Sequence, residues 1–255
     1  MKKEIGVLML LSAVLLSGCV SDKSGAVTIE AGETPSNPVT TEATHESDAK
    51  LIAASENEEV KLYALKETEG VIERVTLDIH GQQKEFDWKI IDTGTKPKVF
   101  HTDLTSDGKP EAIIIINTGR GTGFNTYDIH ILNAEDLSEI KVQNYEEIVN
   151  SQIETHVAKN GDDTLAIKVK AQGKEYNFNY DHDPAPNFNQ EELAFGGVVI
   201  YELENQKVKV RLGASVGISP AYVCDINITY KFDNAKNEFI VDQIEVEPFE
   251  KHKKG

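Results

Sequence analysis

The sequence of 255 residues contains no apolar run long enough to cross a membrane as a helix. Its longest apolar run extends from Ile5 to Leu16 and is interrupted by Gly6 and Ser12. A helix needs about 20 consecutive apolar residues to span the hydrocarbon core. We therefore expect no transmembrane segment in the mature protein, and the run at the N-terminus requires another explanation.

Positive charge is also scarce. The chain has 26 Lys and Arg residues against 43 Asp and Glu residues, which gives a formal net charge of −17. Because nucleic acids and anionic lipid headgroups are themselves negative, this balance argues against both as binding partners. An acidic surface favours solubility, which is the simplest explanation of the charge, and it also favours cations as partners.

The usual signatures of catalysis are missing as well. We find no pairing of a nucleophile with a base. Five of the seven histidines, at positions 80, 101, 130, 156 and 182, are scattered and form no two-histidine metal motif. We expect His130, close to Asp128, to be a structural histidine. The only tryptophan, Trp88, is expected to belong to the core rather than to a sugar-binding platform.

The N-terminus has the features of an export signal. Lys2 and Lys3 precede the apolar run, whose length suits a secretory signal peptide. The run ends in Leu16-Ser17-Gly18-Cys19, which resembles the lipobox of bacterial lipoproteins. The resemblance implies diacylglycerol on the Cys19 thiol and cleavage between Gly18 and Cys19. The mature protein would then be lipid-anchored on the extracytoplasmic face of the cell membrane. An ordinary signal peptide with an incidental cysteine is the alternative.

The organisation that follows has three parts. Residues 1–18 are the expected lipoprotein signal peptide, and residues 19–50 are the expected lipidated N-terminus and flexible tether. The stretch from Val20 to about Lys50 contains no aromatic residue and is rich in Ser, Thr, Glu, Gly and Pro, a composition that cannot offset the entropy of an ordered chain. Residues 51–255 are the expected extracytoplasmic domain. If Cys19 is acylated, Cys224 has no disulfide partner, and we expect it to be a buried, inert thiol.

The domain is predicted to be mainly β. Beyond Gly70, apolar residues recur with a period of two over Val71–Ile79. Residues 80–83 can form a turn that leads into a second strand over residues 84–91, which predicts a hairpin. Further candidate strands continue to the C-terminus, over residues 98–104, 111–117, 127–133, 153–158, 164–171, 174–180, 194–203, 207–216, 223–232 and 238–247.

The number and spacing of these strands favour an antiparallel sandwich or barrel-like domain. One or two short helices are expected, over Asn144–Gln152 and within residues 48–67. The uninterrupted apolar block Ile113–Ile116 predicts a central strand that is covered on both faces.

One segment has the spacing of a cation-binding loop. Between Asp103 and Glu111, oxygen-bearing side chains occupy positions one, three, five and nine, and glycine occupies position six. Such a loop can wind around calcium, with alternate side chains turned inward and a backbone carbonyl near position seven. The predicted metal ligands are Asp103, Thr105, Asp107, Lys109 through its carbonyl, and Glu111. A polar turn at Ser106–Lys109 that needs no metal is the alternative.

The same segment resembles the FG-GAP and VCBS-type repeats of extracellular β proteins, in which such a loop precedes a hydrophobic strand. The wider run over residues 98–133 resembles a domain of uncharacterised exported proteins and lipoproteins of Gram-positive bacteria. The resemblance implies calcium as the cofactor, with Asp103, Asp107 and Glu111 as ligands. Thr105 stands where the repeats usually carry Asp or Asn, which predicts weaker binding. Since the loop occurs once, a multi-bladed propeller is not expected.

A glycine-rich segment follows, Gly119-Arg120-Gly121-Thr122-Gly123. A dinucleotide-binding fingerprint needs a helix after the glycines, whereas Phe124–Tyr127 leads into another strand. We interpret the segment as a flexible loop between strands. As the most glycine-rich loop expected near the candidate cation site, it is also the best candidate for contact with a ligand, with Arg120 as the side chain that would attract an anion.

Two functions from different classes fit these observations. The first is a non-enzymatic surface lipoprotein whose β domain binds calcium and presents a loop face to a cell-wall polymer or a surface protein. The second is an envelope hydrolase acting on cell-wall polysaccharide or peptidoglycan, with its active site in the acidic loop formed by Asp181-His182-Asp183 and Glu191-Glu192. Hydrolysis would require carboxylates about 5–10 Å apart across a sugar.

Overall fold

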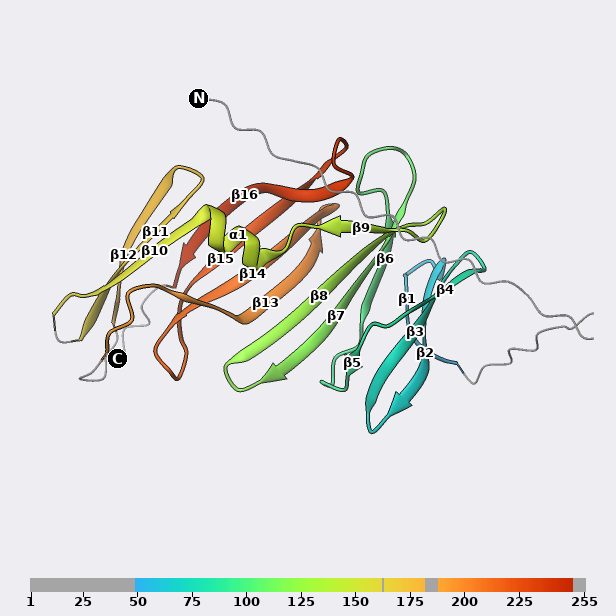
Figure 1. Cartoon of the computed structure of the whole chain (residues 1–255), viewed down its shortest axis with the longest axis horizontal. Helices are drawn as coiled ribbons and strands as arrows, with labels where there is room; N and C mark the ends of the chain where they lie inside the picture. Colours follow the sequence, from blue (N-terminus) through green and yellow to red (C-terminus); the bar gives the residue numbers. More distant parts are fainter. Residues whose placement is uncertain (1–48, 162, 182–187, 250–255) are drawn as a thin grey trace, which may run out of the picture. The chain divides into compact units, whose positions relative to one another are not determined.

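The computed structural model describes residues 49–161, 163–181 and 188–249. In this part the chain is mainly β with one helix, which confirms the expected fold class (Figure 1). No helix in these ranges is long and apolar enough to cross a membrane. The predicted signal peptide, Cys19 and nearly all of the predicted tether lie outside the described residues.

The elements have bounds close to those expected from about residue 70 onward. The helix α1 is Tyr145–Gln152. The strands are β1 Lys50–Ala54, β2 Val60–Thr68, β3 Val71–Ile79, β4 Gln82–Phe86, β5 Ile90–Ile91, β6 Lys98–Thr102, β7 Glu111–Gly121, β8 Phe124–Asn133, β9 Glu139–Val142, β10 Ile153–Lys159, β11 Thr164–Ala171, β12 Lys174–Asp181, β13 Ala194–Glu204, β14 Lys207–Val216, β15 Ala221–Asp233 and β16 Glu238–Pro248.

The first five strands form one antiparallel sheet, in the order β1-β2-β3-β4, with β5 also paired to β3. The predicted turn after β3 is made by His80 and Gly81, both with positive φ, as a two-residue hairpin turn requires. The helix expected within residues 48–67 is wrong, because this segment forms β1 and β2. Val60, Leu62 and Ala64 are buried on one side of β2, which is the period of a strand.

The largest sheet is barrel-like. Its strand order is β13-β14-β15-β16-β9-β8-β7-β6, and β13 also pairs with β8. This extra pairing closes a circuit of six strands, from β13 through β16 to β9 and β8. The two pairings that complete the circuit, β13 with β8 and β16 with β9, are parallel; the other pairings in this sheet are antiparallel.

Strand β7 separates two hydrophobic cores, as its sequence predicted. Ile113 and Ile115 belong to the core shared with β13–β16. Ile114 and Ile116 belong to a second core, shared with the five-stranded sheet. All four side chains are at most 1% exposed, and each such burial contributes about 1.5–3 kcal/mol. The apolar block is continuous because both faces of this strand are covered.

The predicted helix is confirmed in α1. Asn144 is its N-cap, and the Asn144 side chain accepts a hydrogen bond from the backbone N–H of Glu146 at 2.6 Å, the usual capping arrangement. Ile148 packs the helix onto the first core. The chain then continues into β10, which forms a separate three-stranded antiparallel sheet with β11 and β12.

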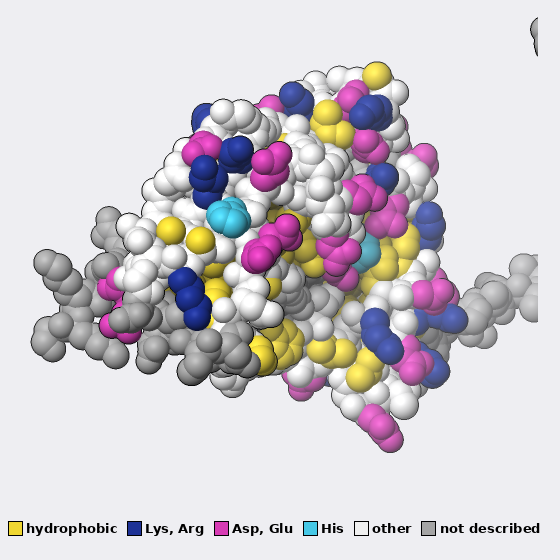
Figure 2. Space-filling view, turned by 60° about the vertical axis from the view of Figure 1, so that its left-hand side comes forward, with side chains coloured by type: hydrophobic (Ala, Val, Ile, Leu, Met, Phe, Trp, Pro, Cys, Tyr) yellow, Lys and Arg dark blue, Asp and Glu magenta, His cyan; other side chains and the backbone are white. Residues whose placement is uncertain are grey.

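Charged side chains cover the outside of the domain. Figure 2 shows acidic and basic side chains intermixed on the face that it presents, rather than separated into two blocks. Many of them pair across neighbouring strands, for example Lys66 with Glu73 and Arg74 with Asp87. Exposed pairs of this kind contribute little to stability individually, so the acidic surplus bears on solubility and partners rather than on the fold.

Candidate metal centre

The predicted cation loop connects β6 to β7 and brings its three carboxylates together. Asp103, Asp107 and Glu111 each offer a carboxylate oxygen, and these oxygens lie within 4.8 Å of one another. Calcium binds oxygen at about 2.3–2.6 Å, so two ligands on opposite sides of the ion are about 4.6–5.2 Å apart. The spacing of the three carboxylates is therefore compatible with one calcium ion between them.

Hydrogen bonds from backbone N–H groups within the loop hold the two aspartate carboxylates in place. Asp103 accepts from the N–H of Ser106 at 2.7 Å and from the N–H of Gly108 at 2.9 Å. Asp107 accepts from the N–H of Lys109 at 2.9 Å. Ser106 and Gly108 both have positive φ, so the chain turns sharply around the Asp103 side chain. These bonds also fit the metal-free turn, and only the response to an ion separates the two interpretations.

Glu111 is the buried member of the group, with 3% of the residue exposed. Its carboxylate accepts from the N–H groups of Leu104 at 2.7 Å and Thr105 at 3.3 Å, and from the Thr105 hydroxyl at 3.2 Å. Burial raises the pKa of Glu111, the hydrogen bonds oppose this rise, and the negative charge of Asp107 adds to it. A bound cation would offset both the burial and the repulsion.

The two remaining predicted ligands lie beside this group in different ways. The Thr105 hydroxyl contacts Glu111 directly, so its oxygen is at the edge of the site. The Lys109 ammonium lies 2.7 Å from Glu135, which raises its pKa. Because Glu135 pairs with this ammonium, the side chain of Lys109 is engaged outside the loop, and only its backbone carbonyl is a candidate ligand.

Arg120 does not belong to this site. It lies at the opposite end of β7 from Glu111, nine residues along the strand, or roughly 30 Å at the usual rise per residue. Its guanidinium is exposed and lies 3.4 Å from the Thr95 hydroxyl. The expectation that the glycine-rich segment adjoins the cation loop is therefore wrong.

The glycines of this segment have a packing role instead. The expected flexible loop is also wrong, because β7 continues to Gly121 and pairs with β8 up to Phe124. A Cβ atom on Gly121 would lie 2.4 Å from the Phe124 ring, and one on Gly119 would lie 2.7 Å from it. These two positions lack side chains because the Phe124 ring occupies the space above the strand.

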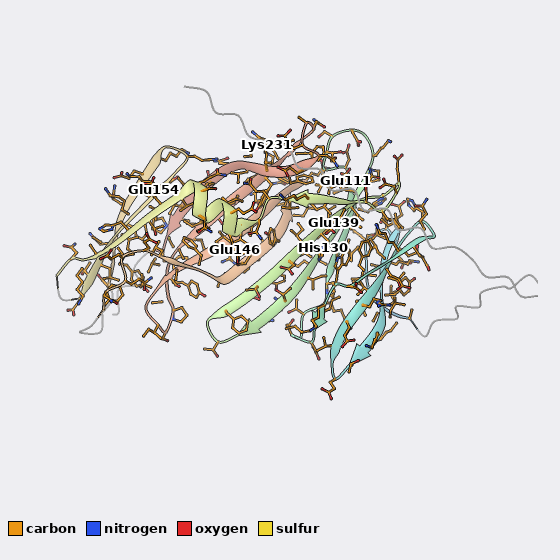
Figure 3. All side chains as sticks on the ribbon, in the orientation of Figure 1. Glu111, His130, Glu139, Glu146, Glu154 and Lys231 are labelled. Atoms are coloured by element: carbon orange, nitrogen blue, oxygen red, sulfur yellow. The ribbon has the colours of Figure 1, made fainter. Side chains whose placement is uncertain are left out.

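The acidic loop of the hydrolase alternative is described only in part, since His182 and Asp183 lie outside the described residues. Glu191 and Glu192 are exposed. Glu192 lines a surface cavity of about 520 Å³ together with Glu146 and Glu154. Figure 3 labels these last two on α1 and on β10, which follows the helix directly.

The predicted cation loop, Asp103–Glu111, therefore offers three carboxylates and one hydroxyl. This all-oxygen set suits a hard cation and supplies no activated nucleophile. Figure 3 places Glu111, the most buried of these ligands, at the start of β7. No known protein family, curated protein or solved structure matches this chain.

Proposed function

We propose that this protein is a lipid-anchored, extracytoplasmic lipoprotein whose β domain binds calcium in the Asp103–Glu111 loop and has a non-enzymatic binding role in the cell envelope. The observation that carries the proposal is the convergence of three carboxylates from one nine-residue loop. Membrane attachment rests on the lipobox-like Leu16–Cys19. The partner would be a cell-wall polymer or a surface protein.

Calcium is preferred over other ions on chemical grounds. Imidazole and thiolate ligands favour zinc and copper, whereas carboxylates, hydroxyls and carbonyls favour calcium and magnesium. Magnesium requires a small, near-ideal octahedron and gives up its water reluctantly. The loop is exposed on one side, at Asp107, and mixes ligand types, so calcium with its larger and more variable shell is the better fit.

Calorimetry of the purified protein tests the loop. Binding to the folded state alone stabilises it by about 2.7 kcal/mol at a hundredfold excess over the dissociation constant, which raises the melting temperature by about 5–10 °C. Millimolar calcium is the relevant range, because extracellular sites bind at about 10⁻⁴–10⁻³ M. We expect a clear shift with calcium and a smaller one with magnesium.

A matched pair of variants separates metal binding from turn formation. Asp107→Ala removes one proposed ligand and also the hydrogen bond to Lys109 N–H. Asp92→Ala removes an equivalent bond, which the Asp92 carboxylate accepts from the N–H of Gly94 at 3.0 Å, outside the loop. Only Asp107→Ala should abolish the calcium response. If the wild type shows no shift, the loop is an ordinary turn and calcium has no role.

Membrane attachment is tested separately. Metabolic labelling with a fatty acid should mark the wild-type protein, and Cys19→Ala should lose the label. A Cys19→Ala protein that keeps the label would refute the proposed anchor without bearing on the calcium loop.

A further inference from the structure

A second group of metal-binding side chains lies at one end of the five-stranded sheet. Glu59 precedes β2, His80 follows β3, and His101 is on β6. A ligand atom from each lies within 4.8 Å of the other two. Nδ1 of His101 is 2.7 Å from one carboxylate oxygen of Glu59, and Nε2 of His80 is 3.6 Å from the other. From their spacing in the sequence these histidines were expected to be scattered, and the structure corrects that expectation by bringing His80 and His101 together.

Strand pairing explains why these residues meet. Val60 and Ile79 form the last pair of the β2–β3 ladder, so Glu59 and His80 are the next residues at this end. A backbone hydrogen bond from His80 N–H to the Glu59 carbonyl, at 3.2 Å, continues the pairing. His101 reaches the same place from β6, and its ring meets the His80 ring edge-on with centroids 5.4 Å apart.

The three side chains combine a fixed ligand with accessible ones. The His101 side chain is 4% exposed, so its ring has little freedom to turn away. The side chains of Glu59 and His80 are 43% and 57% exposed, which leaves the group open to solvent. The Asn57 amide also donates a hydrogen bond to the Glu59 carboxylate and orients it. An ion could enter from solvent and meet a pre-organised site.

We propose that Glu59, His80 and His101 form a binding site for a divalent transition-metal ion of the zinc type. Two imidazoles and one carboxylate are a ligand set that zinc commonly uses, with water in the remaining position. Tetrahedral zinc with bonds of about 2.0–2.1 Å places its ligand atoms about 3.3 Å apart. The separations of 2.7 and 3.6 Å, which run to different oxygens of Glu59, lie on either side of this value. Rotation of the exposed Glu59 and His80 side chains would bring one atom of each residue to the tetrahedral spacing.

Binding replaces a proton with the metal ion. The 2.7 Å contact between His101 and Glu59 needs a shared proton, and the metal would take the place of that proton between the two ligands. If the ion binds Nδ1 of His101, the remaining ring proton sits on Nε2, which is buried and has no hydrogen-bond partner among the described residues. We therefore expect weaker binding than at a fully supported structural zinc site.

This site differs from the calcium loop in its chemistry, although His101 and Asp103 are only two residues apart. The loop offers oxygen ligands from one segment of nine residues. The Glu59–His80–His101 site offers two nitrogens and comes from three segments. Nitrogen ligands select zinc, copper or nickel over calcium, so the two sites should respond to different ions.

Isothermal titration calorimetry with zinc chloride tests the proposal, on protein that carries no polyhistidine tag and has been treated with a chelator. We expect one zinc ion per chain at this site and a higher melting temperature with zinc. His80→Ala is the main variant, because the His80 side chain is 57% exposed. Its melting temperature without metal controls for strain at the positive φ of this turn position. Glu59→Gln keeps the side-chain shape and removes the charge. Each should weaken zinc binding at least about tenfold.

Two further variants act as controls. His156→Ala removes an exposed histidine on β10 and should leave the zinc affinity unchanged. Asp107→Ala should also leave it unchanged, while His80→Ala should keep the calcium response. The proposal is overturned if the wild type binds no zinc, or if His80→Ala binds it as tightly as the wild type. Loss of zinc affinity in Asp107→Ala would also overturn the proposal, because it would show that zinc binds at the calcium loop rather than at a separate site.

Discussion

Trp88 stacks on His130, with the ring centroids 4.0 Å apart and the ring planes inclined by 15°. Trp88 also stacks on Phe86 at 4.2 Å, and Nδ1 of His130 lies 2.7 Å from the Glu139 carboxylate. This row of side chains joins the segment after β4 to β8 and β9. Figure 3 shows His130 and Glu139 next to each other on these two strands. His130 therefore has the packed and hydrogen-bonded surroundings expected of a structural histidine, with Glu139 as its partner.

Trp88→Ala should destabilise the domain by about 2 kcal/mol. Trp88 is half-buried and packs against the second core, so the loss should fall below the 3–5 kcal/mol typical of fully buried aromatic residues. Trp88→Phe keeps a ring that can stack on His130 and should lose less than half as much. Urea denaturation followed by circular dichroism measures both, and equal losses in the two variants would contradict a role for stacking.

Stability should depend on pH through the His130–Glu139 pair. The hydrogen bond from His130 lowers the pKa of Glu139 below its ordinary value of 4.5, against the opposing effect of burial. A lowered carboxyl pKa stabilises the folded state above the unfolded-state pKa, and this contribution is lost as the pH falls through the folded-state pKa. Since the Glu139 side chain is 47% exposed, the effect should not exceed about 1 kcal/mol.

Glu139→Gln isolates this contribution, because glutamine resembles the protonated carboxyl group. The variant should be less stable than the wild type above about pH 5 and should approach it below about pH 3. Denaturation curves across this range give the difference in the free energy of unfolding. A difference that stays constant with pH would show that the loss comes from packing rather than from charge.

Sequence patterns predicted the elements that rest on local regularity. The block Ile113–Ile116 predicted a strand with two covered faces, and the short helix predicted over Asn144–Gln152 is α1. The patterns failed in β2, where apolar side chains lie on both faces of the strand but only one face is fully buried. In β2 the buried Val60 and Leu62 alternate with the partly exposed Lys61 and Tyr63, so the apolar residues did not alternate cleanly with polar ones.

The two candidate metal sites also differ in whether local sequence spacing predicts them. The Asp103–Glu111 loop could be predicted because all its ligands lie within nine residues. The Glu59–His80–His101 site could not, because its members are 21 residues apart and meet only through strand pairing. A signal was present in hindsight: a hairpin over β2 and β3 puts the residue before the first strand beside the residue after the second. That inference required β2, which lies in a segment where a short helix was expected.

Cys224 should be unreactive in the folded protein. It is fully buried, and burial, together with the charge of Asp225, raises the pKa of its thiol to about 12. Because the thiolate is the reactive form, attack on a disulfide reagent should be slower by at least about a hundredfold than in the unfolded chain. Ellman's reagent measures this on Cys19→Ala protein, in which Cys224 is the only cysteine. Rapid labelling without denaturant would contradict the buried position.

The sharpest test of the calcium loop is Thr105→Asp. The Thr105 hydroxyl donates to Glu111 at 3.2 Å, so an aspartate here loses a hydrogen bond and places a fourth carboxylate beside three others. Without calcium, this repulsion should lower the melting temperature by a few degrees, as expected for a loss of about 1 kcal/mol. With calcium, the new carboxylate becomes a charged ligand, and the gain in melting temperature should exceed that of the wild type.

Thr105→Asn is the matched control, because it supplies a carbonyl oxygen without the charge. It should destabilise the metal-free protein less than Thr105→Asp and should respond to calcium with an intermediate gain. The order of the three calcium responses, with threonine lowest and aspartate highest, follows only if residue 105 faces the ion. If Thr105→Asp lowers the melting temperature equally with and without calcium, the side chain at this position does not reach a cation, and the predicted ligand set is wrong at Thr105.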